Sequence, residues 1–279
     1  DERGAERGGG GHDHQANHTA LGSRHPGVVS LTSRTIGSGS RLVLLHGFTQ
    51  NAACWGPFAD RLARDHEVVL VDAPGHGRSG HDDADLAEAA RLSVEVGGDA
   101  IYLGYSMGGR VALHAVLAAP ERVRALVLIG ATAGLDDPAE RASRRRADEA
   151  LATELESSGL ERFLDDWLAQ PLFATLPPEA QHRAARLRNR PEGLAASLRH
   201  CGTGTQQPLW DALAGLATPT LVIAGGDDSK FSALAERLAV TIGPSAAVAL
   251  IHGAGHSAHL ERPDETADAV LAFTAGLAD

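Results

Sequence analysis

The sequence predicts a doubly wound α/β fold, in which a mostly parallel sheet carries an inserted helical cap. Short apolar runs alternate with longer stretches rich in Ala, Leu and Arg, which is the pattern of buried parallel strands and their crossover helices. The interval between Gly130 and Thr220 lacks a convincing strand over roughly ninety residues, far more than an ordinary connection. The alternation predicts the sheet, and the long interval predicts the cap.

The predicted strands follow the apolar runs in chain order. Six of them should form the parallel part of the sheet, at residues 41–46, 67–72, 100–105, 124–130, 220–225 and 247–252. An earlier pair of runs, 28–31 and 33–36, could supply an antiparallel edge. Helices are expected between most strands, for instance at 55–64, 109–118 and 232–241.

These elements divide the chain into three parts. Residues 25–133 and 215–279 should form the α/β core, and residues 134–214 the cap, which prolines break into short helices. Residues 1–24 are rich in Gly, His and charge, a composition typical of a flexible tail or linker. The tail histidines could bind a metal weakly, although a solvated tail fits the composition better; they are His12, His14 and His18.

Composition argues against several classes of function. The chain has 279 residues, of which 43% are hydrophobic, so it can bury one sizeable core. A formal net charge of -11 argues against nucleic acid as a partner. The two cysteines support neither a disulfide framework nor a zinc site, and no apolar run is long enough to cross a membrane. We therefore expect a cytoplasmic protein without a membrane partner, either a monomer or a small homo-oligomer.

Residues 104–108 have the form Gly-x-Ser-x-Gly. They follow an apolar strand and open a helix, which is the setting that a nucleophile elbow requires. The glycines allow a tight turn around Ser106, and the start of the following helix directs partial positive charge at it. We therefore predict that Ser106 is a reactive hydroxyl; the alternative is a plain Gly/Ser turn before a helix.

A serine hydroxyl needs an imidazole to take its proton and a carboxylate to orient that imidazole. Asp228 and His256 each follow one of the last two predicted strands, so the chain order Ser, Asp, His is that of α/β hydrolases. We predict that these two residues complete a triad with Ser106. The alternatives are Asp227 for the acid and His252 and His259 for the base.

The anion that such a reaction creates needs hydrogen-bond donors. Phe48 ends the sequence Leu-His-Gly-Phe just after the first long strand, and its N–H could join that of Met107 as an oxyanion hole. Residues 72–79 form a second Gly- and Pro-rich loop at the carboxyl edge of the sheet, where open α/β folds bind ligands. A purely structural turn explains that loop equally well.

Arginine is unusually frequent in the predicted cap. Residues 138–192 hold nine Arg against ten Asp and Glu, so this segment is nearly neutral within a chain of net charge -11. Most of these arginines are expected to form a solvated basic face. Arg110 is more informative, because it lies four residues after Ser106 and therefore one helical turn on, on the side of the serine.

Short motifs from about residue 41 onward are shared with one family of enzymes. They lie at 45–48, 71–77, 104–110, 166–167, 170–174, 187–188, 228–231 and 254–259. In these motifs the chain resembles the 2-succinyl-6-hydroxy-2,4-cyclohexadiene-1-carboxylate synthases of menaquinone biosynthesis, which have the α/β-hydrolase fold. The first two motifs are common to many α/β hydrolases, whereas the Arg after the elbow, Gln-Pro-Leu-Phe-Ala and Asp-Ser-Lys-Phe are more specific.

The resemblance implies a lyase that uses no metal and no organic cofactor. It would eliminate pyruvate from 2-succinyl-5-enolpyruvyl-6-hydroxy-3-cyclohexene-1-carboxylate, a small anionic substrate with three carboxylates. Arginine and lysine side chains suit carboxylate recognition. By position, the substrate-contacting residues that the resemblance implies are Tyr105, Arg110, Arg144, Trp167, Arg188 and Lys230.

Two other classes of function remain open from the sequence. One is a hydrolase of esters or C–C bonds that uses Ser106 as a covalent nucleophile. The other is a non-catalytic receptor or scaffold with the same fold, which we disfavour because all three predicted triad residues are present.

Overall fold

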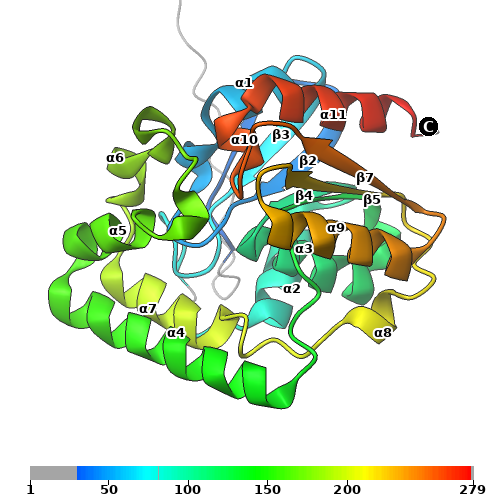
Figure 1. Ribbon diagram of the computed structural model, residues 1–279. Coiled ribbons are helices and arrows are strands. Elements are labelled where there is room, and N and C mark those ends of the chain that lie inside the picture. Colours follow the sequence, from blue (N-terminus) through cyan, green and yellow to red (C-terminus); the bar gives the residue numbers. More distant parts are fainter. Residues whose placement is uncertain (1–29, 81, 278–279) are drawn as a thin grey trace, which may run out of the picture.

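The computed structural model describes residues 30–80 and 82–277 (Figure 1). Its seven-stranded sheet has the order β1-β3-β2-β4-β5-β6-β7. β1 runs antiparallel to β3, and the other neighbouring pairs are parallel. The strands are β1 (Ser33–Ile36), β2 (Ser40–Leu45), β3 (His66–Val71), β4 (Ala100–Tyr105), β5 (Val123–Ile129), β6 (Thr220–Gly225) and β7 (Ala246–Ile251). The prediction of a mostly parallel α/β sheet is confirmed.

Helices cover both faces of this sheet, which explains why the central strands are apolar throughout. The core helices are α1 (Gly56–Leu62), α2 (Leu86–Gly97), α3 (Met107–Ala118), α9 (Ser229–Ile242), α10 (Ala258–Glu261) and α11 (Pro263–Ala275), with 3-10 turns η1 (Ala52–Trp55) and η2 (Pro120–Arg122). Val43 packs with α2, α3 and α9 on one face, whereas its neighbour Leu42 packs with α1 and α11 on the other. Successive strand residues thus enter opposite apolar layers.

A set of helices between β5 and β6 forms a cap over one end of the sheet (Figure 1). Its elements are α4 (Pro138–Ser158), α5 (Leu160–Leu168), η3 (Pro171–Phe173), η4 (Pro178–Gln181), α6 (Arg183–Arg186) and α7 (Pro191–Cys201). The short helix α8 (Trp210–Leu213) lies in the same interval but contacts α9, and its Trp210 and Leu213 belong to the core of the main domain. The cap has a small apolar core that includes Leu155, Phe163 and Leu194, and Phe48 of the main domain packs against it. This contact joins the cap to the loop that follows β2.

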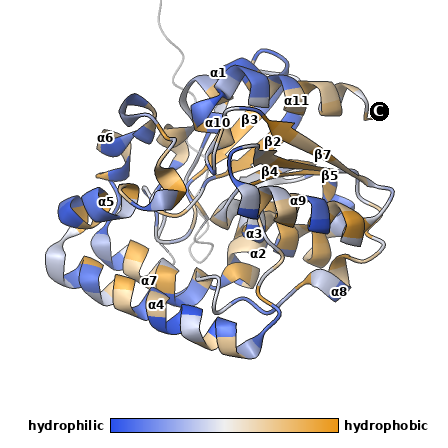
Figure 2. Ribbon diagram, viewed as in Figure 1, coloured by the Kyte–Doolittle hydropathy of each residue, from blue (hydrophilic) through white to orange (hydrophobic). Residues whose placement is uncertain are grey.

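Hydropathy follows the same layering. In Figure 2 the strands are coloured hydrophobic, whereas α4 and α5 carry hydrophilic turns. Within the described part of the chain, no helix is both long and apolar enough to span a membrane.

Several predicted element ends are shifted. The predicted helix at 232–241 begins at Ser229, because the side chain of Asp228 accepts the N–H of Phe231 and caps the helix. Of the predicted edge pair, 33–36 forms β1, whereas Ser30 and Leu31 are not in a strand and 28–29 lie outside the described residues. The predicted tail with its three histidines also lies outside the described residues.

Candidate active site

Ser106 lies at the sharp turn between β4 and α3. Its φ of 51° is in the left-handed region that residues other than glycine rarely adopt. Its N–H donates to the carbonyl of Ile129 at 2.9 Å, which anchors the turn to the neighbouring strand. Only glycine fits at positions 104 and 108. A Cβ on Gly104 would lie 2.3 Å from Gly108 O, and a Cβ on Gly108 would lie 1.9 Å from Leu45 O. The turn has the strand-turn-helix geometry of a nucleophile elbow.

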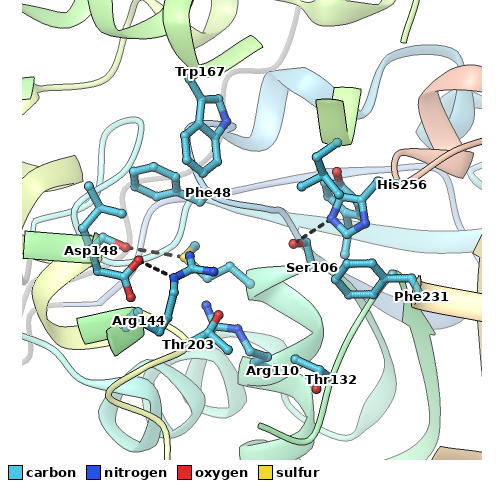
Figure 3. A pocket seen from close by; sticks show the side chains of 18 of the residues that line it. Phe48, Ser106, Arg110, Thr132, Arg144, Asp148, Trp167, Thr203, Phe231 and His256 are labelled. Carbon is cyan, nitrogen blue, oxygen red and sulfur yellow. Dashed lines mark hydrogen bonds and ion pairs between the residues drawn. The ribbon is translucent and has the colours of Figure 1, made fainter. Parts of the chain in front are cut away.

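The structure brings Ser106, His256 and Asp228 together. His256 Nε2 lies 3.2 Å from Ser106 Oγ (Figure 3). His256 Nδ1 lies 3.4 Å from Asp228 Oδ2, and neither of these atoms has a well-aligned hydrogen bond among the described residues. The order of the three groups suits proton transfer from serine to histidine, with the carboxylate at the opposite ring nitrogen.

Asp228 is held in its ionised form. Burial alone would raise the pKa of its carboxyl group, but the interactions with His256 and with the N–H of Phe231 bring that pKa below its ordinary value. The positive charge of Lys230 acts in the same direction. A carboxylate is therefore available at neutral pH to orient the imidazole.

The alternative acid and bases lie elsewhere. Asp227 and His252 have exposed side chains. His259 is fully buried, with its ring centroid 4.3 Å from that of Tyr105 and 4.9 Å from that of Trp55. Burial lowers the pKa of His259 well below its ordinary value, so it is a neutral part of the core.

Glu261 supports the loop that carries His256. Its Oε2 accepts the N–H of Gly255 at 2.7 Å, and its Oε1 accepts the N–H of Ser257 at 3.0 Å. The hydroxyl oxygens of Tyr105 and Ser257 lie 2.7 Å apart, so a further hydrogen bond joins Tyr105 on β4 to this loop. The two residues that flank the histidine are thus held by one buried carboxylate, a role that the sequence did not reveal.

A cavity opens in front of Ser106 and His256 (Figure 3). Its walls come from the elbow, the loop after β2 and the cap helices. The predicted site residues that line it are Phe48, Tyr105, Ser106, Met107, Arg110, Arg144, Trp167, Lys230 and His256. Asp228 lies behind the imidazole and is not among the lining residues.

Phe48 and Met107, the predicted oxyanion-hole residues, both line the cavity next to Ser106. Met107 is the first residue of α3, so its N–H is at the open N-terminal end of that helix. Thr49, the residue after Phe48, has a φ of 66°, and Asn189 of the cap donates to its carbonyl at 2.6 Å. The loop after β2 is therefore fixed from the cap side.

Residues 72–79 do not line this cavity. Asp72 accepts the backbone N–H groups of Ala52 and Arg78 at 2.7 and 2.9 Å. The buried ring of His76 packs against His46, with ring centroids 5.1 Å apart. These contacts give the loop a structural role.

Two arginines line the cavity near the serine, Arg110 from α3 of the main domain and Arg144 from α4 of the cap. Arg110 is buried and its Nη1 lies 3.4 Å from Gln206 Oε1. Burial lowers the pKa of Arg110 to about 10, which still leaves the guanidinium charged at neutral pH. Arg144 donates through Nε to Asp148 Oδ1 at 2.8 Å. In Figure 3 the two arginine side chains lie next to each other, below Phe48 and Trp167.

Arg188, one of the predicted site residues, does not line this cavity. It is exposed and lines a separate surface pocket together with Arg34 and Arg78. Arg186, two residues earlier, is 1% exposed and lines the cavity instead. The chain turns at the end of α6, so the two side chains point to different sides, and sequence position alone could not show which one turns inward.

Arg186 is held firmly in the cap. Its Nε donates to the carbonyl of Gln181 at 2.7 Å, and its Nη1 contacts the hydroxyl of Thr49. Lys230, by contrast, is exposed and lies at the rim. Phe231 beside it packs on His256, with ring centroids 4.3 Å apart.

The site has clear counterparts among known proteins. The sequence profile of the alpha/beta hydrolase family matches residues 42–269. The chain belongs to this family. Among α/β hydrolases it is 34% identical over 237 residues to the 2-succinyl-6-hydroxy-2,4-cyclohexadiene-1-carboxylate synthase of Salmonella typhimurium, a match that covers 82% of this chain and 91% of the relative. A Bacillus subtilis protein that carries the same name provisionally is 35% identical over 242 residues, which are 80% of this chain and 85% of that protein.

Solved α/β-hydrolase structures agree with this relationship. MenH from S. aureus superposes with a TM-score of 0.81 at 32% identity, over 89% of this chain and 98% of that one. A thermophilic esterase from Thermogutta terrifontis, solved with malate bound, has a TM-score of 0.76 at 25% identity, over 88% and 93% of the two chains.

Proposed function

We propose that this α/β hydrolase is a 2-succinyl-6-hydroxy-2,4-cyclohexadiene-1-carboxylate synthase, a carbon–oxygen lyase of menaquinone biosynthesis. The observation that carries the proposal is that one cavity combines a serine–histidine pair with four cationic side chains. These cations are Arg110, Arg144, Arg186 and Lys230. Relatives with this synthase name, at 34% and 35% identity, support the assignment.

The reaction follows from the positions of the ring double bonds. The substrate has one at ring position 3, and the product has them at positions 2 and 4. The ring therefore loses a proton from carbon 2, next to the succinyl ketone, and the enolpyruvyl oxygen from carbon 5. The C–H electron pair enters the ring, and the C–O bond to enolpyruvate breaks. Enolpyruvate then takes up a proton at carbon to become pyruvate, so that no water is consumed.

Each residue at the serine has one role in this proposal. Ser106 removes the ring proton while His256 takes the proton of its hydroxyl, and Asp228 stabilises the imidazolium that forms. The N–H groups of Phe48 and Met107 hold the enolate oxygen of the succinyl ketone. No acyl-enzyme is formed, because the serine acts as a base.

The cations account for the choice of substrate. Three carboxylates on one small molecule need several positive partners, and we assign them to Arg110, Arg144 and Arg186, with Lys230 at the rim. Tyr105 and Trp167 provide apolar surface for the ring. Because such a tricarboxylate does not cross a membrane unaided, we propose that the enzyme acts in the cytoplasm.

Pyruvate release tests the proposal. Purified enzyme is mixed with the enolpyruvyl substrate, and pyruvate is measured by a coupled dehydrogenase assay, alongside cleavage of a p-nitrophenyl ester. We expect pyruvate release with kcat/KM at least about a hundredfold above that for the ester, and loss of most of it in Ser106→Ala.

An esterase is the second candidate, favoured by the structural likeness to the Thermogutta terrifontis enzyme. Rapid ester cleavage through an acyl-enzyme visible by mass spectrometry, without pyruvate release from the enolpyruvyl substrate, would overturn the synthase assignment.

A further inference from the structure

A buried carboxylate stands among the cations of the active-site cavity. Asp148 lies on α4, one turn after Arg144, and is 1% exposed although it lines the cavity. Its Oδ1 accepts Arg144 Nε at 2.8 Å, while its Oδ2 has no hydrogen-bond partner among the described residues. A Cβ at Gly202 would lie 2.5 Å from that Oδ2, so glycine allows α7 to approach closely here. A buried acid in a pocket for an anionic substrate needs an explanation.

The contact with Asp148 uses one particular edge of Arg144. The guanidinium presents five N–H donors in a rigid plane. Asp148 accepts a hydrogen bond from Nε, the nitrogen next to the aliphatic part of the side chain. Within the described residues, Arg144 forms its ion pair with Asp148. The terminal Nη1 and Nη2 therefore remain for a ligand. The side chain of Arg144 is 41% exposed and that of Asp148 is 2% exposed, so the arginine is fixed from its buried side and open on the other.

We propose that Asp148 is a positioning residue for substrate recognition, which fixes the plane of Arg144 so that its terminal nitrogens meet one carboxylate of the substrate. This inference rests on the proposed function and adds to it a residue that contacts the substrate only through another residue. A flexible arginine loses side-chain entropy when it binds, and fixing it in advance removes part of that cost.

If Asp148 acted only through its negative charge, its removal would change substrate binding in the opposite direction from that expected for a positioning residue. A negative charge beside Arg144 and Arg110 weakens their attraction for an anion, so its removal alone would tighten substrate binding. Positioning predicts weaker binding after the same change. The sign of the change in KM therefore separates the two roles.

The test compares Asp148→Asn and Asp148→Ala with the unchanged enzyme in the pyruvate assay. We expect each variant to raise KM for the enolpyruvyl substrate by about tenfold, with kcat lowered by less than about threefold, because the ground state and the transition state both use the carboxylate contact. In an Arg144→Ala background, the same substitutions should change KM by less than about twofold. Glu154→Gln is the control, since it removes the same charge from the exposed face of α4.

A lower KM in Asp148→Asn, or an undiminished effect in the Arg144→Ala background, would overturn the inference. If the wild-type enzyme itself releases no pyruvate, the proposed function is refuted instead. If neither Asp148 variant shows a cooperative thermal transition, Arg144→Lys decides. That variant keeps both charges but loses the planar fork, so positioning predicts a KM about tenfold higher, whereas an unchanged KM would contradict it.

Discussion

Ser106 takes a left-handed backbone conformation, which costs a non-glycine residue about 1–3 kcal/mol. The cost is offset by the hydrogen bond from its N–H to Ile129 on β5 and by the packing of the glycines around it. The conformation places Oγ beside His256 and at the N-terminal end of α3. At the scale of single residues, local strain is the means by which this site exposes its hydroxyl.

The choice between two adjacent acids gives a first prediction. Asp228→Asn should lower kcat by about ten thousandfold, because the amide cannot hold the imidazole in the productive tautomer. Asp227→Asn should change kcat by less than about threefold, since Asp227 is exposed. Steady-state kinetics of both variants check this, with circular dichroism as a test of folding. A large loss in Asp227→Asn alone would show that the acid is misassigned.

The arginines at the end of α6 give a second prediction. Arg186→Ala should lower kcat/KM for the tricarboxylate by about ten- to a hundredfold, because it removes a buried charge-assisted contact. Arg188→Ala, an exposed residue outside the cavity, should change it by less than about threefold. Thermal unfolding of Arg186→Ala separates a binding defect from a folding defect. The reverse ranking of the two variants would refute our placement of the substrate.

Local sequence patterns pointed to some of the residues at the candidate site and gave no indication of others. The Gly-x-Ser-x-Gly turn and the positions after the last two strands pointed to Ser106, Asp228 and His256, which the structure brings close together, because strand ends and glycine turns leave a local signature. Asp148 also left a signal, since it lies four residues after Arg144, the spacing of a helical ion pair. Whether such a pair lines a cavity or faces solvent depends on how the cap packs. That packing also decided between Arg186 and Arg188.

At the scale of elements, α10 and the loop before it act as one unit. Glu261 lies at the end of α10 and holds the backbone on both sides of His256. The imidazole is therefore carried by a loop fixed at two points.

Glu261 gives a third prediction, that Glu261→Gln lowers kcat more than it raises KM. The amide keeps the shape of the side chain but replaces one acceptor by a donor, so one of the two N–H groups loses its partner. We expect kcat to fall by about tenfold or more, with KM changed by less than about threefold. Kinetics check this, and Glu265→Gln on the exposed surface of α11 is the matched control. A rise in KM at unchanged kcat would contradict the proposed role of Glu261 in holding the His256 loop.

The elements themselves were predictable because their apolar runs are short, separate and β-rich. Six predicted parallel strands correspond to β2 through β7 within about one residue at each end. Helix starts were less accurate, because they depend on capping contacts such as that of Asp228 with Phe231. The order of the cap helices in space has no comparable local pattern, since it follows from long-range packing.

At the scale of the whole molecule, buried neutral histidines link stability to pH. Burial lowers the pKa of His46 to about 4 and that of His76 to about 3, and it lowers the pKa of His259 well below its ordinary value. The unfolded chain binds protons on these rings below pH 6.5, whereas the folded protein does not. Their contribution to stability is therefore complete above pH 6.5 and is lost as the pH falls toward 4.

This linkage gives a fourth prediction, measured by urea unfolding between pH 7 and pH 4. The free energy of unfolding should fall with decreasing pH by up to about 1.4 kcal/mol per pH unit for each of these histidines. His76→Gln should reduce the slope, whereas His252→Gln, an exposed residue, should leave it unchanged. A constant free energy of unfolding from pH 7 to pH 5 would be incompatible with neutral buried rings.

The cavity between the core and the cap, as we propose, eliminates pyruvate from a tricarboxylate without adding water. The most direct measurement is the mass and absorbance of the ring product formed from the enolpyruvyl substrate. We predict a conjugated 2,4-diene whose mass equals that of the substrate minus pyruvate, formed in equal amount to the pyruvate released. A ring product heavier by one water molecule and without the diene absorbance would show hydrolysis instead, and would contradict the account.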